Sequence, residues 1–245
     1  MVKIFLFEIS GKMGRRIIEC ANERGVEVVG GFDITAHPTV PTYTDIDAIP
    51  LNFDVIVDFS RAEVLPSVIA LMKRSGKGAV LASTGYSDSQ EKEIREISST
   101  CAVLRSGNMS VGVNLLLKLV SEVTAKIGDA FDIEIIEKHH NQKADAPSGT
   151  ALMLANAVKE VKTDAKFLYG REGASKRNAD EVTIHAVRGG TIVGEHEVIF
   201  AGADEIITLS HTALSRGIFA EGAIKAAKFL ADKTSGYYTM KNALE

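Results

Sequence analysis

The sequence contains little of what marks several protein classes. Two cysteines, Cys20 and Cys101, are too few for a disulfide framework, which indicates a reducing compartment and a cytoplasmic protein. Five prolines and 21 glycines exclude a collagen-like or low-complexity chain. No apolar run approaches the roughly 20 residues of a membrane-spanning helix, and the apolar start of the chain is shorter than the hydrophobic region of a signal peptide. We therefore expect a soluble protein with no membrane partner.

The chain also lacks an excess of positive charge. Its 28 Lys and Arg residues and 32 Asp and Glu residues give a formal net charge of −4. A protein that binds nucleic acid through its phosphates usually carries a basic face, so no nucleic-acid partner is expected. With 245 residues, 45% of them hydrophobic, the chain can form one large domain or two smaller ones with real cores.

The first half of the chain alternates apolar strands with helices. Strands are expected at 3–7, 26–32, 53–59, 78–83 and 102–105, and helices at 15–24, 62–75 and 87–100. The segment 53–59 is apolar almost throughout, as is typical of a strand that is covered on both faces. This alternation predicts an α/β fold with a Rossmann-like, doubly wound parallel sheet.

The second half follows a different pattern. Helices are expected at 113–127, 149–161 and 220–230, and strands at 131–137, 182–187, 192–200 and 205–213. Glycine-rich joints, with no helix between them, connect the last three strands, which is typical of hairpins. We expect a second, α+β domain built on an open mixed sheet, with the final helix packing back on the first domain.

The turn after the first strand could bind a dinucleotide. Gly11 and Gly14 have the spacing of the second and third glycines of a phosphate-binding fingerprint, but Glu8 stands at the first position. Asp33 closes the second strand, where a carboxylate can accept hydrogen bonds from an adenosine ribose. Alternatively, the glycine turn is an ordinary connection between a strand and a helix, and Asp33 is a turn residue without a ligand.

Two loops lie at the ends of later strands. Residues 82–85 and 106–109 carry small hydroxyl side chains and an asparagine. Ligands of open α/β sheets bind outside the carboxyl ends of the strands, so both loops could line the nicotinamide end of a cofactor. They could equally be polar turns.

The segment 139–150 is the richest in chemistry. His139 and His140 follow a strand, and a histidine is the usual proton donor or acceptor near neutral pH. Adjacent histidines of an extended chain point in different directions, and no cysteine is nearby, so no metal site is predicted. Lys143 offers a positive charge for a carboxylate.

The same segment ends at the start of a helix. Ser148 can cap this helix, and the N–H groups of Gly149 and Thr150 can face an anion. We interpret the segment as a site for a small carboxylated substrate that needs a proton; the alternative is a loop that only caps the helix. The remaining histidines are interpreted as surface or strand residues: His37, His185, His196 and His211.

These segments resemble those of the dihydrodipicolinate reductases (4-hydroxy-tetrahydrodipicolinate reductases) of bacterial lysine biosynthesis. The most specific match is the run EIIEKHHNQKADAPSGTA at 134–151. Shorter matches follow the family's order, and together they cover nearly the whole chain: Asp58-Phe59-Ser60, Ser83-Thr84-Gly85, the run 108–114 and Gly194-Glu195-His196.

The resemblance implies a role for each part of the chain. Residues 1–110 with 217–245 would form the dinucleotide-binding domain, and 111–216 a substrate-binding and tetramerisation domain of a homotetramer. His139 would donate the proton, His140 would contact the substrate, and Lys143 would bind and help to protonate it. Gly149 and Thr150 would hold a carboxylate. The cofactor would contact Glu8, Ile9, Ser10, Gly11, Lys12, Met13, Asp33, Ala82, Ser83, Thr84, Ser106, Gly107, Asn108 and Met109.

The implied reaction reduces (2S,4S)-4-hydroxy-2,3,4,5-tetrahydrodipicolinate, a small dicarboxylate, to tetrahydrodipicolinate with NADH or NADPH on the diaminopimelate route to lysine. Family members that use NADPH well often carry arginine after the acidic residue; Ile34 here favours NADH, and the alternative is that Lys12 or Arg15 meets the 2′-phosphate of NADPH. Glu8 replaces the family's glycine and would repel a pyrophosphate. The alternatives are a family member with impaired cofactor binding, acting as a non-catalytic nucleotide sensor or assembly protein, and a different two-domain nicotinamide oxidoreductase, which would leave the run 134–151 unexplained.

Overall fold

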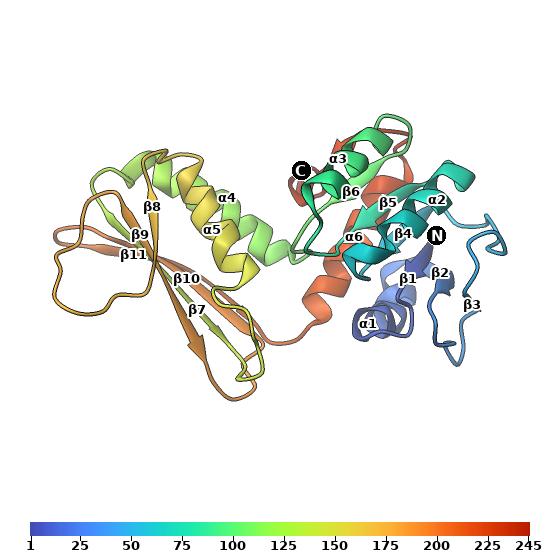
Figure 1. The fold of residues 1–245 in the computed structure, drawn as a ribbon, viewed down its shortest axis with the longest axis horizontal. Coiled ribbons are helices and arrows are strands. Elements are labelled where there is room, and N and C mark those ends of the chain that lie inside the picture. The colour runs from blue at the N-terminus through green and yellow to red at the C-terminus, as the bar shows by residue number, and fades with distance from the viewer. The chain divides into compact units, whose positions relative to one another are not determined.

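The computed structural model describes residues 1–245, which form two compact units (Figure 1). The first consists of Met1–Val111 and Arg216–Glu245, and the second of Gly112–Ser215. The roles that the sequence assigns to the two domains stay predictions. None of the helices in residues 1–245 combines the length and the apolarity that a membrane crossing requires.

The first unit is built on one parallel sheet of seven strands in the order β12-β6-β5-β4-β1-β2-β3. Its strands are β1 (Val2–Phe7), β2 (Val26–Phe32), β3 (Thr42–Tyr43), β4 (Val55–Asp58), β5 (Gly78–Leu81), β6 (Val103–Arg105) and β12 (Tyr237–Tyr238). Its helices are α1 (Lys12–Ala21), α2 (Leu65–Ser75), α3 (Asp88–Ile97), α6 (Gly217–Ala231) and α7 (Met240–Leu244), with short 3₁₀ turns η1 (Asn22–Arg24) and η2 (Ala62–Val64). The Rossmann-like prediction is confirmed.

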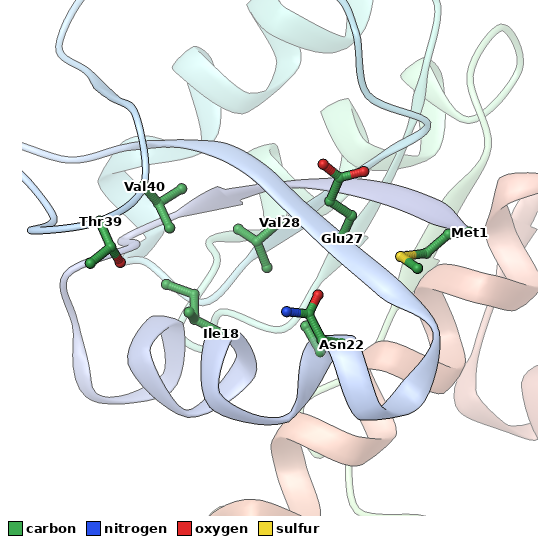
Figure 2. Close-up of a pocket in the computed structure, with 8 residues that line it drawn as sticks. Met1, Ile18, Asn22, Glu27, Val28, Thr39 and Val40 are labelled. Carbon is green, nitrogen blue, oxygen red and sulfur yellow. The ribbon is translucent and has the colours of Figure 1, made fainter.

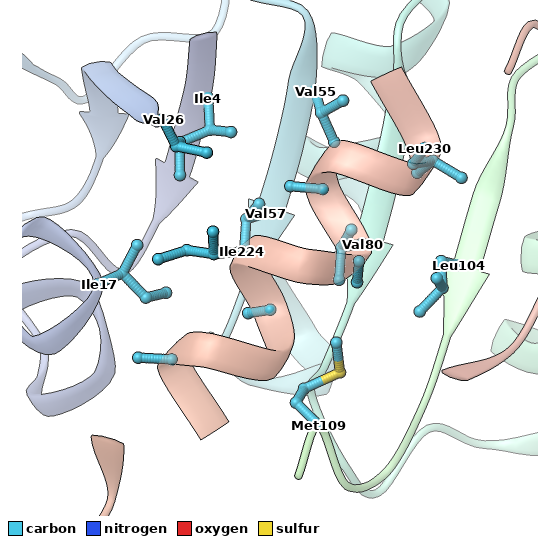
Figure 3. Close-up of a cluster of buried hydrophobic side chains, with 14 of the residues drawn as sticks. Ile4, Ile17, Val26, Val55, Val57, Val80, Leu104, Met109, Ile224 and Leu230 are labelled. Carbon is cyan, nitrogen blue, oxygen red and sulfur yellow. The ribbon is translucent and has the colours of Figure 1, made fainter. Parts of the chain in front are cut away.

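Two hydrophobic clusters cover the two faces of this sheet. Alternate residues of β1 point to opposite sides: Ile4 lies in the cluster against α1 and α6, and Phe5 in the cluster against α2 and α3. Figure 3 shows α6 lying across the sheet with Ile224 and Leu230 turned into the core. The final helix therefore packs on the first unit, as the sequence predicted, and β4 is buried along its whole length.

The second unit is a mixed sheet in the order β11-β10-β7-β9-β8 with two helices on one face. Its elements are α4 (Val111–Ile127, which begins at the last residue of the first unit), β7 (Asp132–His139), α5 (Gly149–Lys159), β8 (Lys166–Tyr169), β9 (Glu181–Arg188), β10 (Gly194–Ala201) and β11 (Ile206–Ala213). In β10 buried and half-buried residues alternate because one face meets α4 and α5. The prediction of a mixed sheet is confirmed.

One expected pairing is wrong. β10 and β11 form the predicted antiparallel hairpin, but β9 and β10 do not pair, because β7 lies between them. β9 runs parallel to β7, and the chain passes from β7 through α5 and β8 before it reaches β9. The short elements β3, β8, β12 and α7 were not expected from the sequence.

Candidate functional site

The turn between β1 and α1 is closed by backbone and carboxylate contacts. The N–H of Gly11 donates to the carbonyl of Glu8 (3.0 Å), and the N–H of Ser10 donates to Asp33 Oδ2 (2.9 Å). Asp33 Oδ1 accepts from the N–H of Thr35 (3.1 Å). A Cβ on Gly14 would lie 2.3 Å from the carbonyl oxygen of Ile9, so glycine is required for α1 to pack this closely. The structure thus brings Asp33 to the glycine turn, and α1 begins at Lys12 without a side-chain cap.

Glu8 occupies this turn in a left-handed conformation with φ 61°, a backbone region that favours glycine. Its side chain lies across Gly11: a Cβ built there would be 2.8 Å from Cγ and Oε1 of Glu8. Burial, followed by the charge of Asp33, raises the pKa of the Glu8 carboxyl; Asp58 also raises it, and Arg61 lowers it. The glycine spacing and Asp33 therefore fit a dinucleotide, and the Glu8 carboxylate opposes its pyrophosphate.

A second carboxylate organises the loops that follow β4 and β5. Asp58 is fully buried, and its Oδ2 accepts hydrogen bonds from Ser83 Oγ (2.8 Å) and Tyr86 OH (3.1 Å). Its Oδ1 accepts from the N–H of Ser60 (2.9 Å). Burial and the nearby Asp58 raise the pKa of Tyr86. The Ser83 hydroxyl is thus bonded within the loop, whereas Ala82 is half-buried and Thr84 exposed.

The loop after β6 is shaped by its own polar groups. Ser106 Oγ donates to the carbonyl of Asn108 (2.7 Å), and Asn108 Oδ1 accepts from the N–H of Ser110 (2.9 Å). Gly107 between them is exposed. The Met109 side chain is 2% exposed and belongs to the hydrophobic cluster under α6 (Figure 3). Of the residues expected to meet the cofactor here, Met109 could offer only its backbone.

In the second unit, Glu137 connects the predicted site residues. This side chain is 0% exposed, yet its Oε2 lies 2.6 Å from His139 Nδ1 and its Oε1 accepts from the N–H of Ser148 (2.9 Å). The guanidinium of Arg188 donates a hydrogen bond to each of the two oxygens, to Oε2 at 2.8 Å and to Oε1 at 2.7 Å. Burial by itself raises the pKa of Glu137, but the hydrogen bonds from Arg188, His139 and Ser148 outweigh it and bring this pKa below its ordinary value. Glu137 is therefore an anion.

His196 joins the same cluster from β10. Its Nε2 lies 3.1 Å from Ser148 Oγ, and its ring meets that of His139 edge-on at 5.2 Å between centroids. Burial, followed by the neighbouring His139, lowers the pKa of His196 to about 4, so the imidazole is neutral at pH 7. His196 is a strand residue, as interpreted from the sequence, and the structure also brings it into contact with the predicted site residues Ser148 and His139. The signal that could have found it was the Gly194-Glu195-His196 match.

The other predicted residues of this segment lie on the loop and the first turn of α5. Lys143 Nζ donates to Asp145 Oδ1 (2.8 Å), and the backbone N–H of Lys143 donates to the carbonyl of half-buried His140 (3.1 Å). Ser148 caps α5 as expected, accepting from the N–H of Ala151 (3.2 Å). Gly149 and Thr150 open the helix, with free space beside Gly149. Sequence reasoning missed Glu137, Arg188 and Asp58 as partners.

The remaining histidines have other surroundings. His185 Nε2 lies 2.8 Å from Glu134 Oε2 on the same sheet, and His211 stands opposite His196 in the β10–β11 register. His37 lies in a loop, where its Nδ1 is 3.3 Å from the N–H nitrogen of Thr39. A hollow between α1, β2 and residues 39–40 of the first unit is shown in Figure 2; none of its lining residues belongs to the predicted site.

A Rossmann-like unit with an α+β unit inserted in it is the plan of a pyridine-nucleotide-dependent reductase, and comparisons with known proteins support this class. The chain belongs to the dihydrodipicolinate reductase family: residues 2–109 match the model of the N-terminal part of dihydrodipicolinate reductase and residues 112–244 that of the C-terminal part. The resemblance seen in the sequence is confirmed.

Individual relatives are similar to this chain over its whole length. A 4-hydroxy-tetrahydrodipicolinate reductase of Clostridium novyi is 47% identical over 249 residues, covering 100% of this chain and 99% of the relative. One of Caldanaerobacter subterraneus is 45% identical over the same coverage. Among solved structures, a dipicolinate-bound dihydrodipicolinate reductase from Paenisporosarcina superposes with a TM-score of 0.79 at 25% identity, covering 97% of this chain and 98% of the other. An amine dehydrogenase from Mycobacterium smegmatis, at 10% identity and a TM-score of 0.61, shares the fold.

Proposed function

We propose that this chain reduces (2S,4S)-4-hydroxy-2,3,4,5-tetrahydrodipicolinate to tetrahydrodipicolinate, with release of water, on the diaminopimelate route to lysine. The observation that carries this proposal is the segment 134–151. It holds the family's most specific motif, and it folds so that His139, a buried carboxylate and the start of α5 meet. Relatives that bear the name of this reductase are 44–47% identical over the full chain.

The chain's own groups supply binding and a proton. The start of α5 offers the N–H groups of Gly149 and Thr150 and the positive end of the helix dipole to a substrate carboxylate. Lys143 adds a cation that binds the dicarboxylate and draws electrons from its ring, while His140 contacts the substrate. Water leaves when the 4-hydroxyl group is eliminated with a proton of the neighbouring ring carbon, which gives a double bond conjugated with the imine. The hydride then adds to the carbon that carried the hydroxyl group, and His139 protonates the neighbouring ring carbon. A bound nicotinamide supplies that hydride.

For the cofactor we propose NADH rather than NADPH. The turn at 8–13, Asp33 and the loops 82–84 and 106–109 would hold it. Asp33 lies at the turn, where it can accept from a ribose hydroxyl and would repel a 2′-phosphate. Ile34, which is 94% exposed, supplies no cation for that phosphate. A cytoplasmic homotetramer is proposed on the family resemblance.

Glu8 supports a second candidate function. Its carboxylate across Gly11 opposes a pyrophosphate, as would suit a family member that binds nucleotide weakly and acts as a sensor or an assembly protein. Such a protein would show no turnover at saturating substrate and millimolar NADH.

The test is coupled turnover on freshly prepared substrate, together with NADH titration by calorimetry. His139→Gln should lower kcat by about 10²–10⁴-fold, as for loss of a general acid, and Lys143→Ala should lower it as well. Both should leave the NADH Kd nearly unchanged. Matched controls are His185→Gln on β9 and Lys126→Ala on the exposed side of α4. Full activity in both site variants would defeat the assignment.

A further inference from the structure

We propose that Glu137 is the positioning residue of this site, a single buried carboxylate that fixes both the proton donor and the helix start that binds the substrate. This inference rests on the proposed function, because it takes His139 as the proton donor.

The carboxylate of Glu137 is held at all of its acceptor positions. Oε2 meets His139 Nδ1 and one Arg188 nitrogen, and Oε1 meets the Ser148 N–H and the other Arg188 nitrogen. Four donors around two oxygens leave the group no free rotation. Hydrogen bonds to an ionised acceptor are about twice as strong as neutral ones, so the position of this group is well defined.

The protonation of the His139 ring follows from this contact. An ionised carboxylate can only accept, so Nδ1 of His139 carries the hydrogen that points at Glu137. The other nitrogen, Nε2, is then the one available to exchange a proton with a substrate. Nε2 lies beside Gly194, where a built Cβ would be 3.1 Å away. Glycine at 194 thus leaves room around the reactive nitrogen.

Arg188 makes the buried anion possible. A carboxylate with no exposed surface is strongly disfavoured unless a charge and hydrogen bonds compensate it, and Arg188 supplies both through a two-pronged contact. The same guanidinium donates to the carbonyl of Asp145 (2.7 Å), which ties down the loop that carries Lys143.

Ser148 connects Glu137 to the start of α5, which is proposed to bind the substrate carboxylate. Its backbone N–H donates to Glu137, and its hydroxyl caps α5. The first N–H groups of α5 and the His139 ring are therefore fixed relative to one carboxylate. Errors of about 1 Å in such a geometry cost on the order of 100-fold in rate.

The decisive variant is Glu137→Gln. A glutamine offers one acceptor oxygen and adds an NH₂ donor that must face one of the four donors, so the ring of His139 loses its fixed partner. We expect kcat to fall by about 10²-fold with the NADH Kd unchanged. Nitrogen NMR of the histidine ring should show that the Nδ1–H form of His139 is no longer dominant. Glu134→Gln is the matched control, because Glu134 also pairs with a histidine on this sheet, and it should change neither quantity.

Gly194→Ala keeps the proposal testable if Glu137→Gln does not fold. Its methyl group presses on His139 Nε2 while Glu137 keeps its contacts, so kcat should fall with the Nδ1–H signal retained. Unchanged kcat in either folded variant, or an unchanged His139 signal in folded Glu137→Gln, overturns the positioning role. A wild-type protein that shows the Nδ1–H form but no turnover refutes the proposed function instead.

A second, independent inference concerns Glu8 in the first unit. We infer that a dinucleotide binds the glycine turn with Glu8 neutral, so that cofactor binding takes up a proton at this side chain. It also rests on the proposed function, in that a pyrophosphate is taken to bind at this turn.

The geometry places Glu8 where a pyrophosphate would approach. Its backbone is held by the N–H of Glu8 donating to the Phe32 carbonyl (2.9 Å), and its side chain covers Gly11. The charged groups that face it are Asp33 at the end of β2, Asp58 at the end of β4 and the one cation, Arg61. Burial, together with two carboxylates against one guanidinium, already favours the neutral form, and a bound pyrophosphate adds further negative charge to the same place.

The bound state holds the proton more tightly than the free state, so affinity for NADH falls as pH rises. The fall approaches tenfold per pH unit between the pKa of Glu8 in the free protein and its higher pKa in the complex.

Calorimetric titration of the full chain with NADH, in two buffers of different ionisation enthalpy and from pH 5.5 to about 8.5, measures this uptake. We expect up to one proton bound per NADH, and a Kd that becomes pH-independent in Glu8→Gln while the exposed control Glu23→Gln keeps the wild-type profile. No proton uptake in the wild type, or the same pH dependence in Glu8→Gln, overturns the inference. Proton-linked binding without turnover refutes only the proposed function.

Discussion

Replacing Gly222 by alanine separates what helix propensity predicts from what the fold predicts. Gly222 lies inside α6, where alanine is ordinarily better than glycine by about 1 kcal/mol. A Cβ at this position would, however, lie 1.7 Å from the carbonyl oxygen of Met109. Carbon–oxygen contacts are normally no closer than about 3.3 Å, so the helix or the loop must move by roughly 1.6 Å. The clash is with backbone, which cannot rotate away.

Overpacking of this kind costs typically 1–3 kcal/mol, and a backbone clash belongs near the upper value. After about 1 kcal/mol of propensity is subtracted, we expect Gly222→Ala to destabilise the first unit by about 2 kcal/mol. Urea unfolding measures this as a lower midpoint, and NADH should bind more weakly because the Met109 loop moves. Gly189→Ala is the control, since nothing lies within 4 Å of its built Cβ. A raised midpoint in Gly222→Ala would refute the reasoning.

Three further expectations follow from the same contacts. The pKa of His196 is about 4 in the folded chain against 6.5 for a free imidazole, so unfolding binds a proton between these values; stability should fall by about 3 kcal/mol as pH drops through that window. Urea midpoints against pH will show this slope, flattened in His196→Asn. Asp58→Ala leaves the Ser83 and Tyr86 hydroxyls without their acceptor, which should cost about 2–4 kcal/mol and lower the pKa of Tyr86 towards its ordinary value in an ultraviolet titration. Ile34→Arg should raise affinity for NADPH relative to NADH at least tenfold in parallel titrations, and equal effects on both cofactors would contradict the preference proposed here.

Local sequence patterns predicted most of the helices and strands of the fold. The strand expected at 26–32 coincides with β2. Gly25 and Gly76, which follow the helices expected at 15–24 and 62–75, adopt the left-handed conformation that commonly ends a helix. Which strands pair with one another was harder to predict from the sequence. A period of two says which face a residue occupies but not which strand is its neighbour, so β9 and β10 were read as a hairpin although β7 separates them.

In the candidate site, too, the residues that are close in sequence could be predicted, whereas the contacts between distant segments could not. The loop that carries His139, Lys143 and Ser148 is continuous in sequence and could be recognised as a unit. Glu137 and Arg188 are 51 residues apart, and Ser148 and His196 are 48 apart, so their contacts depend on the β7–β9 and β7–β10 registers. Nothing local marks Arg188 as the partner of a buried carboxylate.

Glu137 and Glu8 show how the surroundings of a carboxylate set its charge. Glu137 is the more deeply buried, which alone should make it the harder to ionise, yet its pKa is lowered because Arg188, His139 and a backbone N–H all donate to it. Glu8 is less buried than Glu137, yet its pKa is raised, first by the burial that it does have and then by Asp33, because no hydrogen-bond donors compensate its charge as they do at Glu137. A site with compensated charge keeps its geometry over a wide pH range, whereas the glycine turn changes charge when an anion arrives. The loss of NADH affinity expected as pH rises through the titration of Glu8 should therefore appear in the KM for NADH before it appears in kcat, and saturating NADH should remove most of it.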